Sequence, residues 1–315
     1  MTSGEIARAR QWYANLVAAL TPADGQITPE QMRVAYDRVC ASIRVPSEAH
    51  FEQVDVDGVS GCWVTVPESS SNRTILYLHP GGYAVGSVYG HRHVAAALAR
   101  ASAARVLAID YRLAPENPHP AAVEDAATAY RFILHHGATP SSVAICGDSA
   151  GGGLAIATLL SLRDAGTSLP ACGVAVSPWT DLALSGESMA TKAGEDPVNS
   201  REMLGGLAMM YLAGADPQTP LASPLYGDLA GLPPLLVLAG SAEVLLDDAK
   251  RLAVRAQAAG VDVTLKVADD MVHIWTFFES FLPEAQAALD QIGQFVTAHC
   301  RQKPTADHYL RKVTR

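Results

Sequence analysis

The stretch SVAICGDSAGGG, residues 142–153, contains the pattern that decides the fold. A short apolar run leads into Gly147-Asp148-Ser149-Ala150-Gly151, which fits G-x-S-x-G, and an Ala/Leu-rich stretch follows. Small residues around a central serine are typical of a tight, strained strand-to-helix turn that raises the hydroxyl above a sheet. The helix N-terminus beneath it would stabilise developing negative charge. We therefore predict that Ser149 is a nucleophile.

A glycine-rich phosphate-binding turn is the alternative interpretation of this stretch. The residues fit neither G-x-G-x-x-G nor G-x-x-x-x-G-K-[ST], because no lysine follows the glycines. The pattern and its strand-then-helix context favour the nucleophile.

Short apolar runs alternate with longer helical patterns on both sides of this turn. The candidate strands are residues 62–67, 74–80, 104–112, 142–148, 172–179, 234–240 and 263–269. The candidate helices are residues 90–102, 121–137, 151–166, 245–260 and 284–300, and three of them stop at glycines suited to a left-handed cap, Gly137, Gly166 and Gly260. Continuous apolar strands between helices predict the α/β class, with a mostly parallel sheet covered on both faces.

Two segments interrupt this alternation. Residues 1–45 are helical without a strand partner, and residues 180–228 form an insertion with a Met-rich apolar piece. We expect the two segments to pack together as a helical cap over the strand ends. The α/β core would then comprise residues 46–179 and 229–300, and a basic, polar tail at 301–315 is expected to be loosely held.

Composition excludes several classes of protein. With 49% hydrophobic and 17% charged residues, the chain of 315 residues is globular, and its net charge of −9 argues against a nucleic-acid surface. Five dispersed cysteines support neither a disulfide framework nor a zinc site. The N-terminus does not read as a signal peptide, and no stretch is apolar for the roughly 18 residues of a membrane span. A cytoplasmic location is therefore expected.

Three motifs, in this order and spacing, carry a family resemblance: HPGGY (79–83), DYRLAPENPHPAAVEDA (110–126) and GDSAGGG (147–153). Together they resemble the hormone-sensitive-lipase branch of the α/β-hydrolase superfamily, which includes carboxylesterases and lactone hydrolases. The resemblance spans roughly residues 60 to 300. It implies an α/β-hydrolase fold and hydrolysis of carboxylic esters by a serine nucleophile.

The resemblance also implies an oxyanion hole of backbone N–H groups. Relatives usually carry a histidine followed by three glycines, and their donors map onto Gly81 and Gly82, with Ala150 as the third. Glycines let the backbone approach the reacting oxygen closely, and such donors supply a large catalytic term. Pro80 departs from the family pattern, but it removes only a donor that the family does not use. We expect His79 to hold this loop by hydrogen bonding.

The base and the acid follow the nucleophile in this family, in the order serine, acid, histidine. Three histidines follow Ser149, namely His273, His299 and His308, and His273 lies just after the last candidate strand, where the family places its catalytic histidine. Many relatives carry aspartate at the position of Glu243, whereas one subgroup, including lactone hydrolases, carries glutamate. The resemblance thus implies Glu243 as the acid. The alternatives are Asp247, Asp269 and Asp270; Asp247 and Asp248 begin the next helix, where carboxylates commonly serve the helix dipole.

Other polar residues are expected to have structural roles. Arg112, Glu116 and Asp125 are predicted to form a buried polar network, and Asp148 to support the turn at Ser149. His91 and His93 have a spacing that could suit a metal, but no further ligand cluster accompanies them, so a solvated helix N-terminus is favoured.

These residues predict a serine carboxylesterase that hydrolyses short-chain, uncharged esters through an acyl-enzyme, without metal or cofactor. Its partner would be a small-molecule ester, and a homodimer is possible. Lactone opening or deacetylation by the same triad is the alternative. A non-catalytic ligand receptor on this fold is a more remote one, because such receptors lack a triad member.

Overall fold

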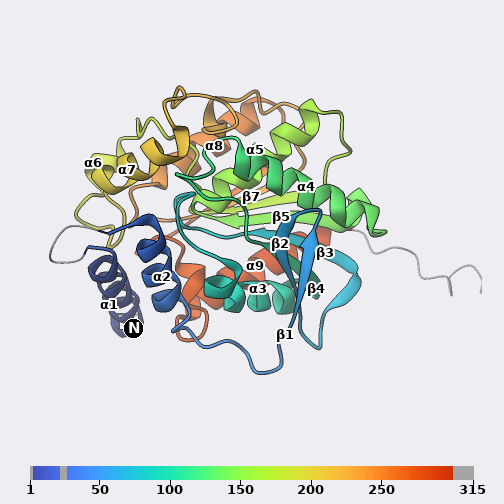
Figure 1. Ribbon diagram of the computed structural model, residues 1–315, viewed down its shortest axis with the longest axis horizontal. Helices are drawn as coiled ribbons and strands as arrows, with labels where there is room; N and C mark the ends of the chain where they lie inside the picture. Colours follow the sequence, from blue (N-terminus) through green and yellow to red (C-terminus); the bar gives the residue numbers. More distant parts are fainter. Residues whose placement is uncertain (1–2, 22–26, 301–315) are drawn as a thin grey trace, which may run out of the picture.

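An eight-stranded sheet runs through the centre of the molecule in the order β1-β2-β4-β3-β5-β6-β7-β8 (Figure 1). The computed structural model describes residues 3–21 and 27–300. The strands are β1 (His50–Val56), β2 (Val59–Thr65), β3 (Ser70–Leu78), β4 (Ala104–Ile109), β5 (Val143–Asp148), β6 (Cys172–Val176), β7 (Leu235–Gly240) and β8 (Val263–Ala268). In this order, neighbouring strands from β4 through β3 and β5 to β8 are all parallel. At the other edge, β2 pairs antiparallel with β4, and β1 pairs antiparallel with β2. The predicted α/β class with a mostly parallel sheet is confirmed.

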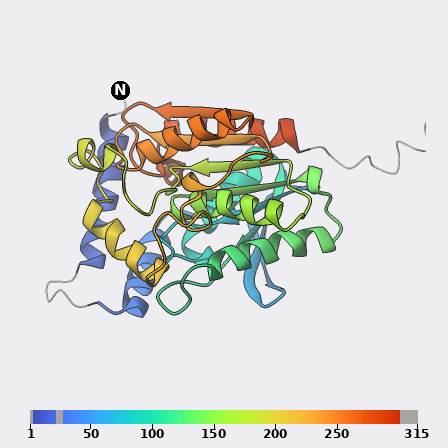
Figure 2. The same ribbon diagram turned by 90° about the horizontal axis from the view of Figure 1, so that it is seen from above.

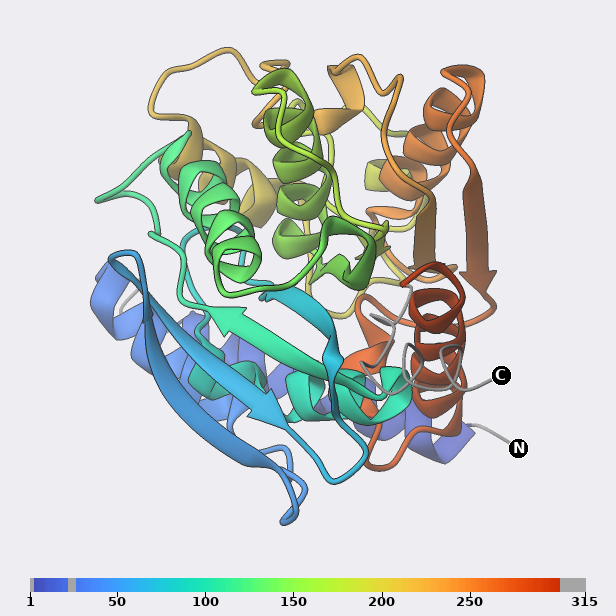
Figure 3. The same cartoon turned by 90° about the vertical axis from the view of Figure 1, so that its right-hand side faces the viewer.

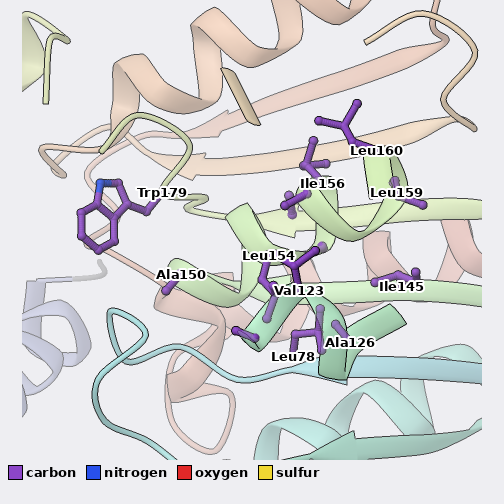
Figure 4. Close-up of a cluster of buried hydrophobic side chains, with 14 of the residues drawn as sticks. Leu78, Val123, Ala126, Ile145, Ala150, Leu154, Ile156, Leu159, Leu160 and Trp179 are labelled. Carbon is purple, nitrogen blue, oxygen red and sulfur yellow. The ribbon is translucent and has the colours of Figure 1, made fainter. Parts of the chain in front are cut away.

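Helices cover both faces of this sheet. On one face lie α4 (Ala121–His135), α5 (Ala150–Asp164) and α8 (Leu246–Ala258), and on the other α3 (Val88–Ser102) and α9 (Pro283–His299) (Figure 1). The central strands are buried on both sides, so alternate residues enter two cores: Leu76 and Leu78 face α4 and α5, whereas Ile75 and Tyr77 face α3 and α9. Figure 4 shows the first core, where leucines of α5 pack over β3 and β5.

Four more helices lie at the end of the sheet where the parallel strands finish (Figure 2). They are α1 (Ser3–Leu20), α2 (Pro29–Cys40), α6 (Ser188–Thr191) and α7 (Arg201–Leu212). The guanidinium of Arg10 on α1 donates to the carbonyl of Glu195 between α6 and α7, at 2.7 Å. The segments expected to form a cap therefore contact each other, although they lie far apart in the chain.

Two of these helices begin at side chains suited to a helix start. Thr28 and Gln31 form a capping box at α2, in which each side chain accepts from the other residue's backbone N–H. Ser200 accepts from the backbone of Met203 at the start of α7. Such caps satisfy donors that the first helical turn leaves unpaired.

All seven candidate strands and five candidate helices exist, with ends that differ by up to a few residues. The left-handed glycines also lie where expected, with φ of +91° at Gly137, +66° at Gly166 and +81° at Gly260. One strand was missed. β1 has the sequence HFEQVDV and lies at the sheet edge, where it pairs with β2 (Figure 3). Most of its side chains are accessible to solvent. A solvent-exposed edge strand does not need a continuous apolar run, and such runs were the signal from which the other strands were predicted.

The prediction of a loosely held tail at 301–315 lies outside the described residues. Within residues 3–21 and 27–300, none of the helices combines the length and the apolar character that crossing a bilayer requires.

Candidate active site

Ser149 stands on a strained turn between β5 and α5. Its backbone has φ 56° and ψ −120°, a left-handed φ that non-glycine residues rarely adopt. A Cβ on Gly147 would lie 2.0 Å from the carbonyl oxygen of Gly151, and a Cβ on Gly151 would lie 2.0 Å from that of Leu78. The small residues of G-x-S-x-G are therefore required by close backbone approach, as the sequence predicted.

The side chains of Ser149, His273 and Glu243 form a continuous hydrogen-bonded row. The Nε2 atom of His273 lies 2.9 Å from the hydroxyl oxygen of Ser149, and its Nδ1 atom lies 2.9 Å from Oε2 of Glu243. The backbone N–H of Gly240 donates to Oε1 of Glu243 at 3.2 Å. This is the geometry of a nucleophile, a base and an orienting acid.

Parallel strands bring these three residues together. Ser149 follows β5, Glu243 follows β7 and His273 follows β8, and the carboxyl ends of parallel strands open on the same edge of a sheet. The residues are nearly inaccessible: Ser149 is 8% exposed, His273 4% and Glu243 0%. Their electrostatic coupling is thus weakly screened by solvent.

Burial and the Glu243 contact act in opposite directions on His273. Burial alone would lower the pKa of His273, but the hydrogen bond and the charge of Glu243 outweigh it, so the pKa lies above its usual value. Burial raises the pKa of Glu243, and the contact with His273 partly offsets that rise. A carboxylate on Nδ1 thus stabilises the imidazolium that forms when His273 takes a proton.

The loop after β3 approaches Ser149 from the other side. Gly81 and Gly82 have φ of +127° and +61°, and a Cβ on Gly81 would lie 2.1 Å from the carbonyl oxygen of Val85. Among the described residues, no backbone carbonyl accepts from the N–H groups of Gly81, Gly82 or Ala150. These three donors are therefore available for an oxyanion.

His79 holds this loop, as expected. Its Nδ1 atom donates to the carbonyl of Pro80 at 2.7 Å, and its ring stacks on Tyr111 with centroids 4.2 Å apart. Tyr111 in turn donates its hydroxyl to the carbonyl of His79 at 2.8 Å. His79 does not contact Ser149, which leaves His273 as the base within reach.

The solvated helix start predicted for His91 and His93 is wrong. Both side chains are buried, each 1% exposed, because α3 packs against the segment around Phe277. His91 also lies parallel to the ring of His79, with centroids 5.7 Å apart. Among the described residues there is no group of three potential ligands that could hold a metal ion.

The buried network predicted for Arg112, Glu116 and Asp125 is wrong in part. Arg112 does bind Asp125, but its other carboxylate partner is Glu124, and its side chain is 46% exposed. Glu116 instead pairs with Arg33 of α2. The motif therefore makes one ion pair within the α/β core, through Arg112, and another with α2, through Glu116.

The carboxylates near the triad have other partners. Asp148 accepts the hydroxyl of Tyr77 at 2.7 Å, in line with a supporting role. Asp247 and Asp248 do start α8, but Asp247 accepts the backbone N–H of Ser188 and Asp248 those of Thr180 and Asp181. Both thus fasten the insertion to α8 in addition to facing the helix dipole.

A cavity of about 570 Å³ opens in front of Ser149 and His273. Its apolar lining comes from α1, α2 and the insertion, and includes Leu16, Met32, Tyr36, Val198, Met203 and Leu207. A larger groove, of about 810 Å³, lies along α1 and α2, but no triad residue lines it. The smaller cavity is therefore the candidate substrate site.

Two polar residues near the triad had no signal in the sequence. Tyr13 on α1 donates its hydroxyl to the carbonyl of His273 at 2.6 Å, across 260 positions of chain. Asp196, in the insertion, accepts the backbone N–H of Val244 next to Glu243, at 2.9 Å. Neither belongs to a motif, so only the packing of the cap reveals them.

Comparison with known proteins places this geometry in context. A family described as alpha/beta hydrolase fold matches residues 75–277. The chain is 46% identical to an acetyl-hydrolase of Streptomyces hygroscopicus over 87% of its length and 90% of that protein's. It is 34% identical to an esterase of Acinetobacter venetianus, over 88% of this chain and 92% of the other.

Among solved structures, an esterase of the bacterial hormone-sensitive lipase family is similar to the whole domain. It superimposes with a TM-score of 0.92 at 46% identity, covering 96% of this chain and 100% of the other. An esterase/lipase from an uncultured bacterium reaches a TM-score of 0.88 at 41% identity, over 94% and 98% of the two chains.

Proposed function

Because the chain belongs to the α/β-hydrolase family, in its hormone-sensitive-lipase branch, and hydrolyses carboxylic esters, we propose that it does so through an acyl-enzyme on Ser149. The observation that carries this proposal is the row of two 2.9 Å contacts joining Ser149, His273 and Glu243. Serine is a weak nucleophile until an adjacent base removes its proton, and this row provides that base.

The reaction follows from the positions of the side chains. Nε2 of His273 takes the hydroxyl proton as Ser149 attacks the ester carbonyl, and Glu243 stabilises the resulting imidazolium. His273 then gives the proton to the departing alkoxide as the carbon–oxygen bond breaks. Water, deprotonated by His273, attacks the acyl-serine, and the released serine oxygen recovers the proton.

The backbone donors of Gly81, Gly82 and Ala150 are proposed to bind the oxyanion of each tetrahedral intermediate. Their N–H groups lie on the two turns that flank Ser149, and the glycines leave no side chain in the way. Ala150 also begins α5, so the positive end of the helix dipole adds to the stabilisation. Such preorganised donors act before any solvent rearrangement is needed.

We propose short-chain, uncharged esters as the substrates. The cavity is mainly apolar, and Leu207 of α7 packs against the loop that carries Gly81 and Gly82, here called the oxyanion loop: a Cβ on Gly82 would lie 2.5 Å from the Leu207 side chain. The similarity to a protein named acetyl-hydrolase supports a small acyl group. Residues 1–45 and 180–228 would together act as the cap that limits acyl length.

The test is a series of p-nitrophenyl esters from acetate to dodecanoate, with wild type and Ser149→Ala. We expect the highest kcat/KM at two to four carbons and loss of turnover in the variant. An organophosphate should label wild type at Ser149 alone. Full turnover in Ser149→Ala would overturn the proposal, and a maximum at long chains would overturn the substrate class.

Lactone opening and deacetylation remain the second candidate, because a glutamate occupies the acid position, as in the lactone-hydrolase subgroup that the motifs resemble. A panel of small lactones and acetylated amines, measured beside the esters, separates these activities. Higher kcat/KM on either would reassign the natural substrate class while leaving the triad in place.

We also propose the cellular location of the enzyme, its oligomeric state and its lack of cofactor and nucleic-acid binding. The triad chemistry needs neither metal nor cofactor, and the five cysteines are free and buried, which suits a reducing cytoplasm. We propose a cytoplasmic enzyme that can form a homodimer and does not bind nucleic acid. Analytical ultracentrifugation and fractionation of the producing cells test the first two points, and a filter-binding assay with DNA and RNA tests the third.

A further inference from the structure

We propose that Tyr13 and Ser177 are positioning residues that clamp the peptide unit between His273 and Ile274 and so aim the imidazole of His273. This inference rests on the proposed function, because it assumes that His273 is the base. The two residues come from different parts of the fold: Tyr13 lies on α1 and Ser177 directly follows β6.

The clamp acts on both polar groups of one peptide plane. Tyr13 donates its hydroxyl to the carbonyl oxygen of His273 at 2.6 Å, and the N–H of Ile274 donates to the hydroxyl oxygen of Ser177 at 3.0 Å. Among the described residues, no backbone donor reaches the carbonyl of His273. Since a trans peptide is planar, holding both groups fixes the rotation of the plane, and with it the direction of the His273 side chain.

The peptide plane needs this support because neither neighbouring element provides it. β8 ends at Ala268, and the short helical turn after His273 begins only at Trp275. Ile274 has a left-handed φ of 38°, which is unfavourable for a β-branched residue. The segment carrying His273 is thus a loop, and its conformation depends on contacts from outside it.

Both clamping side chains are themselves held firmly. Tyr13 is 2% exposed and lies edge-on to the rings of Trp12 and Phe278, each with centroids 5.3 Å away. Burial raises the pKa of Tyr13 well above its usual value, so the phenol remains a donor. Ser177 is fully buried and its hydroxyl is also one of the groups that lower the pKa of Glu243 by hydrogen bonding. Ser177 therefore contacts the backbone beside the base and also lowers the pKa of the acid.

Catalysis depends on the orientation of the His273 ring, because its two nitrogen atoms must keep their 2.9 Å contacts with Glu243 and Ser149 at the same time. A misplacement of about 1 Å at a catalytic group can cost about 10²-fold in rate. Loosening the peptide plane should therefore lower kcat and leave KM nearly unchanged, since neither hydroxyl is needed to fill the apolar cavity.

The experiment compares Tyr13→Phe and Ser177→Ala with matched controls elsewhere in the protein. Tyr130 donates its hydroxyl to the backbone carbonyl of Ser168 at 2.7 Å, and buried Ser223 accepts the backbone N–H of Leu182 at 2.8 Å. Tyr130→Phe and Ser223→Ala thus remove the same kinds of hydrogen bond away from the triad. Each variant loses one oxygen atom, and thermal unfolding shows whether it folds.

We expect kcat on p-nitrophenyl acetate to fall about ten-fold in Tyr13→Phe and Ser177→Ala, with KM within two-fold of wild type. The acid limb of kcat/KM should move to lower pH, because the Glu243 contact that raises the pKa of His273 is weakened. The charged groups that face His273, which are Glu243, Asp196 and Asp148, are unchanged in these variants. The controls should keep kcat and the pH profile even where their melting temperature falls.

The double variant tests whether the two residues act on one peptide unit. Once one side is released, releasing the other should add little, so the double variant should lose less than the product of the single losses. Losses that simply multiply, or a kcat in both single variants within two-fold of the controls, would overturn the inference. Should Tyr13→Phe not fold, Ser177→Gly replaces it, because glycine suits the φ of 46° at that position. Ser149→Ala separates the two proposals: if it is inactive while the clamp variants match the controls, only the clamp is wrong.

Discussion

The backbone of Ser149 is held by hydrogen bonds to residues outside the triad. The N–H of Ser149 donates to the carbonyl of Val176 at 2.8 Å, and the N–H of Trp179 donates to the carbonyl of Ser149 at 2.9 Å. These bonds tie the strained backbone of Ser149 to the last residue of β6 and to the segment that follows β6. Strain at a nucleophile persists only where the surrounding structure over-determines it, and here it does.

At Glu243, a mutation can remove the negative charge of the side chain and keep an oxygen that accepts a hydrogen bond from Nδ1 of His273. Glu243→Gln keeps the shape but removes the charge, so we expect kcat to fall by about 10²- to 10⁴-fold. Asp247→Asn is the matched control, because Asp247 binds Ser188 of α6 and not His273. Steady-state kinetics on p-nitrophenyl butyrate measure both, and a larger loss in Asp247→Asn would contradict the assignment of the acid.

At Gly81, the prediction concerns close approach. A side chain there would meet the carbonyl oxygen of Val85 at 2.1 Å, which forces the oxyanion loop to move. Gly81→Val should lower kcat by about 10²-fold or more. Gly194→Ala is the control, since a Cβ on Gly194 meets nothing within 4 Å. Wild-type turnover in a folded Gly81→Val would remove this loop from the oxyanion hole.

Among the elements, α7 contributes several side chains to the cavity in front of Ser149. It comes from the insertion, far from Ser149 in the chain, yet its residues Met203, Leu204 and Leu207 line the cavity. The contact of Leu207 with the oxyanion loop brings this helix against the core. We therefore propose that an element of the cap, rather than of the α/β core, limits the space for the acyl chain.

Leu207→Ala should widen the acyl space. We expect the ratio of kcat/KM on octanoate to that on acetate to rise about ten-fold, because added apolar groups then find room and contacts. Met209→Ala is the control on the same helix, since Met209 is 74% exposed and points away from the cavity. An unchanged chain-length profile in Leu207→Ala would show that α7 does not set acyl length.

At the scale of the whole molecule, buried titratable groups tie stability to pH in opposing directions. Burial lowers the pKa of His79 to about 4 and those of His91 and His93 to about 3. Burial also raises the pKa of Asp148 to about 7 and that of Glu279 to about 7. Acidification thus destabilises the fold through the histidines and stabilises it through these carboxyls.

A single histidine isolates one of these effects. The unfolded chain binds a proton at His93 from about pH 6.5 downward, whereas the folded chain does not, so wild type loses about 2 kcal/mol between pH 7.5 and 5.0 through this group. His93→Gln should therefore destabilise the protein at pH 7.5 and do so by about 2 kcal/mol less at pH 5.0. Urea unfolding at both values measures this, with exposed His135→Gln as the control. If His93→Gln lowered the free energy of unfolding equally at both pH values, proton binding at His93 would not be the source of the pH dependence.

Much of the α/β core could be predicted, because its signals are local. The buried parallel strands contain continuous apolar runs, and three of the predicted helices stop at a glycine with a left-handed φ. The predicted ends overran where apolar residues continue beyond the last ladder bond: residues 172–179 were expected as one strand, but β6 stops at Val176, because Ser177 turns the chain with a φ of 46°. β1 was missed since its polar sequence reflects an edge, which depends on what lies beside it.

The order of residues along this chain determined the strand–helix alternation and the strained turn at Ser149, because periodicity and turn chemistry act over a few neighbouring positions. The short choice of bases and acids came from the family resemblance of its motifs. Only the tertiary structure decided that His273 and Glu243 meet Ser149, that α1 and α7 line one cavity, and that His91 and His93 are buried. These outcomes depend on contacts between segments far apart in the chain, such as the 260 positions between Tyr13 and His273. No local pattern encodes them, since they arise from the order of strands in the sheet and from how the cap packs upon it.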